Sequence, residues 1–178
     1  MRNRLSLGLS LAAAFALPAL AVGAIVSVPK AIAVAKLKGA NEVPSVITNA
    51  SGDFKAKIFA DHVDFTLSFS GLTGDTLFAH IHVGQQHTNG QVMVFLCNNT
   101  PMGPAPRPCP NGSGTVTGTF SSADVIGPAG QGVDPAEFAA TLQAIAEGAS
   151  YANVHTTSFG NGEIRGQLLQ IGTTPTGE

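Results

Sequence analysis

Two neighbouring stretches of the chain alternate between apolar and polar residues, and this alternation is the feature that most limits the possible folds. The stretches cover residues 52–60 and 62–70. Because successive side chains of a β-strand point to opposite faces, a period of two predicts a hairpin with one buried face. The apolar members of that face are Phe54, Ala56, Ile58, Val63, Phe65, Leu67 and Phe69.

Similar short segments follow, and the turns between them use many of the 21 glycines and 11 prolines. One segment differs, because Asp134 is a good N-cap, Pro135 suits a first helical position and Gly148 suits a C-terminal cap. We therefore predict a mainly β fold. It should be an antiparallel β-sandwich or barrel of about eight short strands, with one α-helix over about residues 135–147.

The N-terminal residues 1–35 have the layout of a secretory signal peptide. Two arginines near the start precede an uncharged stretch that extends to Val28, and small-x-small cleavage sites end at Ala21, Ala33 and Ala35. An uncleaved anchor helix is the alternative, because about 20 apolar residues can span a bilayer. Both interpretations predict a secreted, periplasmic or cell-surface location, with the membrane as a partner only if the segment stays uncleaved.

A single domain is expected over residues 36–171, followed by a flexible tail over residues 172–178. Its first strand should begin at Ala35, and its last strand should run from Glu163 to Ile171. Nucleic acid is not expected as a partner, because only 9 Lys and Arg residues are scattered along the chain and backbone binding needs clustered cations.

Cys97 and Cys109 flank a proline-rich segment that cannot be a helix or a central strand. In an oxidising compartment, two such cysteines are expected to form a disulfide that closes the loop. A metal site built on the two cysteines is the weaker alternative, because their spacing matches no zinc pattern.

Three histidines can point into one place from two strands. His80 and His82 share a face of one predicted strand, and His155 lies in a later one. One interpretation is a copper or zinc site, whose affinity should fall below about pH 6.5, where ordinary imidazoles become protonated. His87 is a candidate extra ligand, whereas His62 is expected at the surface.

The other interpretation of the same histidines is a buried polar network. Asn153 shares a face with His155, and Glu163, Arg165 and Gln167 share a face of the last predicted strand. Glu163 and Arg165 are close enough to be expected as an ion pair, and imidazoles can complete such a network by hydrogen bonding. The residues leave both interpretations open.

Four segments of the chain, taken in order, resemble the successive signatures of the CHRD domain, which is named after the extracellular protein chordin. The resemblance runs from about Leu37 to Leu169 and implies an extracellular, β-rich domain. It does not imply a defined activity, and the loop between Cys97 and Cys109 looks like an addition to the shared pattern. The segments are Leu37–Ser45, Ala79–Gly84, Ala146–Thr156 and Gly162–Leu168.

We therefore predict a secreted CHRD-like binding module for an unknown extracellular protein or ligand, in which the three histidines are candidate metal ligands. No catalytic residue is assigned, because the chain has no Gly-x-Ser-x-Gly motif and no cysteine beyond the expected disulfide. Two alternatives stay open. One is a copper- or zinc-dependent metalloenzyme resembling superoxide dismutase in site chemistry, and the other is a structural envelope or matrix protein.

Overall fold

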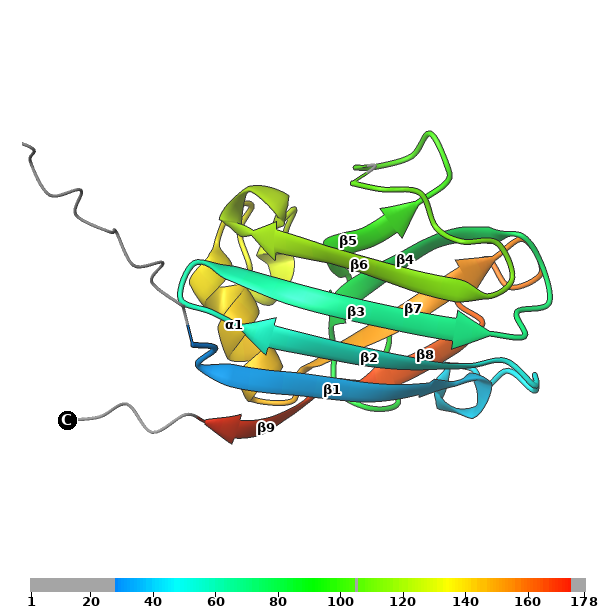
Figure 1. Ribbon diagram of the computed structural model, residues 1–178, viewed down its shortest axis with the longest axis horizontal. Helices are drawn as coiled ribbons and strands as arrows, with labels where there is room; N and C mark the ends of the chain where they lie inside the picture. Colours follow the sequence, from blue (N-terminus) through cyan, green and yellow to red (C-terminus); the bar gives the residue numbers. More distant parts are fainter. Residues whose placement is uncertain (1–27, 105, 174–178) are drawn as a thin grey trace, which may run out of the picture.

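The computed structural model describes residues 28–104 and 106–173, which form one antiparallel sheet and one α-helix (Figure 1). The strands are β1 (Ala31–Lys38), β2 (Ser51–Ile58), β3 (His62–Ser70), β4 (Thr76–Val83), β5 (Val92–Asn98), β6 (Gly114–Ser121), β7 (Ser150–Thr156), β8 (Ile164–Gln167) and β9 (Leu169–Thr173). Their order in the sheet is β5-β4-β7-β8-β1-β2-β3-β6, and β9 also pairs with β1. Because β5 and β6 at the two ends approach each other, the sheet curls into a nearly closed barrel. The predicted fold class is confirmed.

The β2–β3 hairpin has the register that its alternating residues predict. Phe54 faces Leu67, and Ala56 faces Phe65, with all four side chains inside the barrel and almost fully buried. Burial of about 25 cal/mol per Å² of apolar surface makes this inner face the main source of stability. The barrel interior therefore holds the hydrophobic core, and any polar site must lie elsewhere.

The gap between β5 and β6 is closed by the loop that joins them. Cys97 and Cys109 form the predicted disulfide at the base of this loop. Between them, Arg107 donates a hydrogen bond of 3.1 Å to the carbonyl of Leu96 in β5. Its guanidinium also occupies the space that a side chain at Gly118 of β6 would need. The loop thus links the two unpaired edges of the barrel.

The helix α1 (Phe138–Ala146) is shorter than the predicted segment 135–147. Ala136 has a positive φ of 65°, and the N-cap Glu137 also lies outside the helical conformation, so the helix begins only at Phe138. The Glu137 carboxylate does accept a hydrogen bond from the backbone N–H of Asp134, but within a turn that precedes the helix. The prediction of Asp134 as the N-cap and Pro135 as the first helical residue was therefore wrong.

The first and last strands also differ from expectation. The last strand is divided in two, because the chain pairs with β7 up to Gln167 and with β1 from Leu169 onward. The first strand begins at Ala31 rather than Ala35, so it includes part of the predicted leader. Within the described residues no helix is long and apolar enough to cross a membrane. The predicted leader up to residue 27 and the tail from residue 174 lie outside those residues.

Candidate metal centre

The polar face predicted for the histidine strands is the outer face of β4, β7 and β8. Neighbouring residues such as Ala79, Ile81 and Val154 point into the barrel core. In the sheet register His80 lies opposite Asn153, and His82 lies opposite Tyr151. Side chains that are opposite or diagonal on one face of a sheet can contact each other. Strand pairing therefore brings together residues that are far apart in the sequence.

The three histidines converge as predicted. One ring nitrogen from each of His80, His82 and His155 lies within 4.8 Å of the corresponding nitrogens of the other two. The ring centroid of His80 is 5.3 Å from that of His82 and 5.1 Å from that of His155. All three side chains are buried. Three nitrogen donors at this spacing surround a point that a single metal ion can occupy.

Two of the imidazoles are held in a fixed orientation by backbone carbonyls. Nδ1 of His82 lies 3.0 Å from the carbonyl oxygen of Gly90, and Nδ1 of His155 lies 2.9 Å from that of Gly160. The neutral tautomer that donates from Nδ1 to a carbonyl carries its lone pair on Nε2. Metal-bound histidines in proteins generally donate their other ring N–H in this way. Nε2 of His82 and Nε2 of His155 are therefore the nitrogens available to a ligand.

The remaining ring nitrogens have no hydrogen-bond partner among the described residues. They are Nε2 of His82, Nε2 of His155 and both nitrogens of His80. Leaving a buried polar atom unpaired costs about 1–3 kcal/mol, so a cluster of four is unusual in a stable core. The side chain of Asn153 still interacts with His82 as a hydrogen-bonding group. The nitrogens of His80 and Nε2 of His155 have no such partner among the described residues, so any polar network among the imidazoles is incomplete.

Burial sets the protonation state of the cluster. It lowers the pKa of His80 to about 2 and those of His82 and His155 to about 4, because the charged imidazolium loses its hydration. The charges of the neighbouring imidazoles lower the pKa of His80 further. All three rings are therefore neutral at physiological pH, which is the state that binds metal.

Aromatic rings fill the space around the imidazoles. His80 packs edge-on against Phe95 at 4.2 Å between centroids and also contacts Phe78 at 4.6 Å. His82 stacks on Tyr151 at 4.7 Å with an angle of 6° between the rings. These contacts restrict the ring rotations, so the donor atoms stay in place without a bound ion.

Loops cover the outer face and exclude bulk water. The segment between β4 and β5 folds back against the end of β4. A side chain at Gly90 would collide there with the carbonyl oxygen of Val83. Glycine at this position therefore allows the carbonyl of residue 90 to reach His82. Asn89 of the same segment donates a 3.0 Å hydrogen bond to the carbonyl of Val43, which joins two of the covering loops.

The predicted polar residues fall into two separate groups. The carboxylate of Glu163 accepts hydrogen bonds from the hydroxyls of Thr48, Thr73 and Thr156 at 2.7 to 2.9 Å. Burial alone would raise the pKa of Glu163, but these hydrogen bonds lower it. The predicted ion pair between Glu163 and Arg165 was wrong, because β8 begins at Ile164 and Glu163 turns toward the threonines.

Arg165, Asn153 and Gln167 do lie on the face that carries the histidines. The guanidinium carbon of Arg165 is 3.4 Å from the centre of the Tyr151 ring, whose contacts also include His82. Gln167 donates to the backbone carbonyls of Gly84 and Gly148. Among these residues, Asn153 faces the cluster most directly, because it is the register partner of His80.

Glu42 is a buried acidic residue of this region that the sequence interpretation did not single out. Burial raises its pKa to about 7, although the charge of Arg165 and the side chain of Asn153 lower it. Glu42 belongs to a segment already noted for its resemblance to the CHRD pattern, which was the available signal. His87 does not join the cluster of three, and His62 pairs with Asp61 near the surface.

Comparison with known families gives one match. The sequence model of the CHRD domain family matches residues 33–168, which include all three histidines and both cysteines. No curated protein and no solved structure matches significantly.

Proposed function

This chain belongs to the CHRD domain family, and we propose that its domain is an exported binding module that holds one copper or zinc ion through His80, His82 and His155. The observation that carries this proposal is the convergence of three neutral imidazoles in which the nitrogens of His80 and Nε2 of His155 have no other partner among the described residues. Unpartnered buried nitrogens are costly in a metal-free protein, whereas a bound ion satisfies one nitrogen of each imidazole, three of the four in all.

The ligand set suits copper and zinc best. Imidazole nitrogens bind both ions well, and the usual affinity order places Cu²⁺ above Zn²⁺. The disulfide supports an exported protein, because such bonds persist in oxidising compartments. Geometry and ligand type decide which metal a site selects, and the packing of Phe95 against His80 helps to fix the geometry here.

A metal-dependent enzyme is the second candidate, and the number of ligands favours it. Three protein ligands leave a coordination position open, as in catalytic zinc sites, where water or substrate completes the shell. His80, His82 and His155 provide three ligands, and the buried acidic residue Glu42 is not part of their cluster. Turnover of a redox or hydrolytic substrate by the metal-loaded protein would distinguish this candidate from a binding module.

The decisive variant is His80→Phe. His80 makes no hydrogen bond and lies among aromatic rings, so phenylalanine can replace it without leaving a polar partner unpaired. We expect His80→Phe to fold with at least the stability of the metal-free wild type but to lose metal affinity about a hundredfold or more. Calorimetric titration of metal-free protein with Cu²⁺ and Zn²⁺ measures the affinity, and the wild type should bind about one ion.

His62→Ala is the matched control. His62 is the first residue of β3, lies outside the three-histidine cluster and contacts the carboxylate of Asp61. It should bind metal like the wild type. If the wild type shows no saturable binding at neutral pH, or if His80→Phe binds equally well, the proposed metal site is wrong. A lower stability of His80→Phe without metal would instead favour the polar network.

A further inference from the structure

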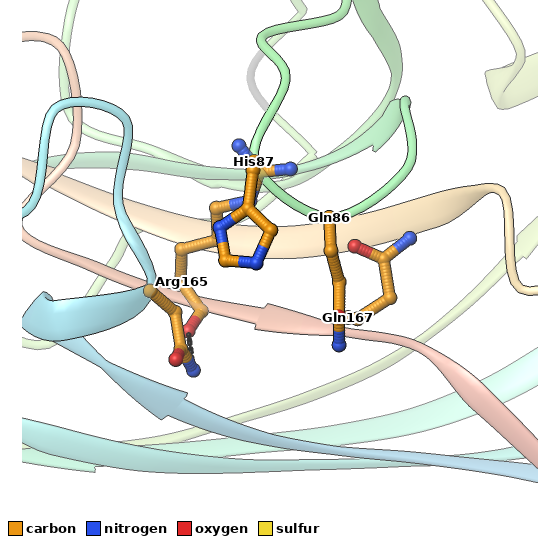
Figure 2. Close-up of a pocket in the computed structure, with 5 residues that line it drawn as sticks. Gln86, His87, Arg165 and Gln167 are labelled. Atoms are coloured by element: carbon orange, nitrogen blue, oxygen red, sulfur yellow. Dashed lines mark hydrogen bonds between the residues drawn. The ribbon is translucent and has the colours of Figure 1, made fainter.

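A small pocket lies beside β8, on the face that carries Arg165 and Gln167 (Figure 2). It has a volume of about 110 Å³ and includes none of the three candidate ligands. Figure 2 shows Gln86 and His87 projecting from the loop between β4 and β5 toward Arg165 and Gln167 of β8. Asn41 completes the lining.

Arg165 is the charged group of this pocket. Only 2% of the residue is exposed, and Nη1 has no hydrogen-bond partner among the described residues. Its Nη2 donates to the carbonyl of Gln85 at 3.0 Å, and Tyr151 packs against the guanidinium plane. A buried guanidinium with an unused N–H is costly and can be satisfied by a negatively charged acceptor.

No acidic side chain of the described protein neutralises Arg165 by direct contact. The ion pairs found within 4.0 Å involve other residues, and the pocket lining contains no carboxylate. Glu42 acts on Arg165 through its charge but lines a different hollow, beside Pro44 and Phe159. The positive charge of this pocket therefore comes from Arg165, and the unused N–H of its guanidinium is the group that favours an anion.

The neutral groups are fixed in place by the backbone. Gln167 donates its amide N–H groups to the carbonyls of Gly84 and Gly148 at 2.8 and 2.7 Å. Asn41 donates to the carbonyl of Arg165 at 3.0 Å. These bonds orient the pocket walls before a ligand enters, which lowers the entropic cost of binding.

The pocket continues into a wider, mainly apolar groove. Asn41, Gln86 and Gln167 line both spaces, and the groove has a volume of about 580 Å³. It extends over β1 and β9, where Val34 and Leu169 line it, and 55% of Leu169 is exposed. The small pocket alone holds only a head group, whereas the groove reaches the roughly 300–1,000 Å³ of typical ligand sites.

We propose that the Arg165 pocket and the adjoining groove bind an amphipathic carboxylate, with the carboxylate on the Arg165 guanidinium and the apolar chain along Val34 and Leu169. This site is separate from the three histidines and does not require a metal. The guanidinium supplies a charge-assisted hydrogen bond that selects the head group, and the groove rewards the length of the apolar chain.

Octanoate is a suitable probe, and acetate and 1-octanol isolate its two parts. Calorimetric titration of metal-free protein should show saturable binding of octanoate. Acetate should bind with an affinity at least about tenfold lower than that of octanoate, and the affinity of 1-octanol should also be much lower. Arg165→Gln should lower octanoate affinity about tenfold or more. His80→Phe should bind octanoate normally, which separates this result from the metal proposal.

Leu169→Asp and Ile171→Asp form the matched pair. Both residues are about half exposed on β9, but only Leu169 lines the groove. Leu169→Asp should weaken octanoate binding about tenfold, whereas Ile171→Asp should not change it. Absence of saturable octanoate binding overturns the proposal, and so does equal weakening by the two aspartate variants. This pair decides the matter even if Arg165→Gln fails to fold.

Discussion

At the scale of single residues, the three imidazoles differ from ordinary histidines in when they lose a proton. The sequence led us to expect metal affinity to fall below about pH 6.5, which is the pKa of a solvated imidazole. Burial moves the pKa values to about 4 for His82 and His155 and to about 2 for His80. We therefore expect the threshold to lie below pH 6.5, because the buried imidazoles stay neutral at lower pH than solvated ones.

This shift makes a testable prediction for metal binding. Between pH 7.5 and 5.5 the apparent Kd for Zn²⁺ should change by less than about threefold, because protons compete weakly for buried imidazoles. Solvated imidazoles would lose about tenfold in affinity per ligand over the same range. Competition with a chromophoric chelator at several pH values measures this, and a loss near a thousandfold would contradict the burial of the cluster.

Glu163 is the second informative residue, because it is a buried carboxylate that serves the fold rather than the candidate site. We expect Glu163→Gln to lower the free energy of unfolding by about 3 kcal/mol, since hydrogen bonds from Thr48, Thr73 and Thr156 lose their charged acceptor. Urea denaturation measures the change.

The same Glu163→Gln variant should bind Cu²⁺ like the wild type, because Glu163 is not a member of the three-histidine group. A loss of metal affinity in protein that is still folded would place Glu163 in the site after all. Thr73→Val offers a milder comparison, because it removes one donor and leaves the carboxylate in place.

The sequence predicted the residues of the site better than their partners. The alternation of strand side chains correctly placed His80 and His82 on one face with His155 nearby. The alternation pattern could not identify Glu42 as a buried residue of this region, because Glu42 lies in a loop whose path depends on the whole fold. The Glu163–Arg165 pair failed for the same reason, since the side chain at a strand end follows the loop contacts.

At the scale of elements, β7 explains why hydropathy alone gave an incomplete picture. All seven of its residues are buried, although only every second one faces the barrel core. The other face is buried by loops, and loop paths are the least predictable part of a chain. The helix is a second case in which a local pattern was insufficient. Asp134 and Pro135 are favourable cap residues, but the positive φ of Ala136 delays the start of the helix.

The extent of β1 distinguishes among the three candidate cleavage sites of the predicted leader. Cleavage after Ala33 or Ala35 would remove inward-facing residues, including Ala31, which pair with β2 and β9. The site that ends at Ala21 leaves the strand whole, although it lies outside the described residues. We expect the intact mass of the exported protein to match a chain that starts at Val22. A mature chain starting at Val34 or Lys36 would contradict this expectation.

At the scale of the whole molecule, the inner and outer faces of the barrel carry different kinds of side chain. Apolar side chains fill the interior, whereas the buried side chains of His80, His82, His155 and Arg165 lie on the outer face of β4, β7 and β8. The hydrophobic core and the proposed metal site thus depend on different residues of the same strands. One consequence is that folding stability should respond to pH mainly through the outer face.

The buried histidines should make the metal-free protein less stable as the pH falls. Their folded pKa values lie below the unfolded value of about 6.5, so below that pH the unfolded chain binds more protons, and stability is lost. Glu42 acts in the opposite sense, because its folded pKa of about 7 exceeds its unfolded value of 4.5. Between about pH 5 and pH 6 the unfolded chain therefore binds about two more protons than the folded protein. Its three cluster histidines bind three more, and Glu42 binds one fewer.

A balance of two protons predicts that the free energy of unfolding falls by about 2.7 kcal/mol per unit of decreasing pH in this window. Urea denaturation of metal-free protein at pH 5.0, 5.5 and 6.0 measures the slope. His80→Phe should reduce it by about half, because it removes one titrating group, whereas His62→Ala should leave most of it intact. A slope near zero in the wild type would mean that the imidazoles are protonated in the folded protein, which is incompatible both with their burial and with a preformed metal site.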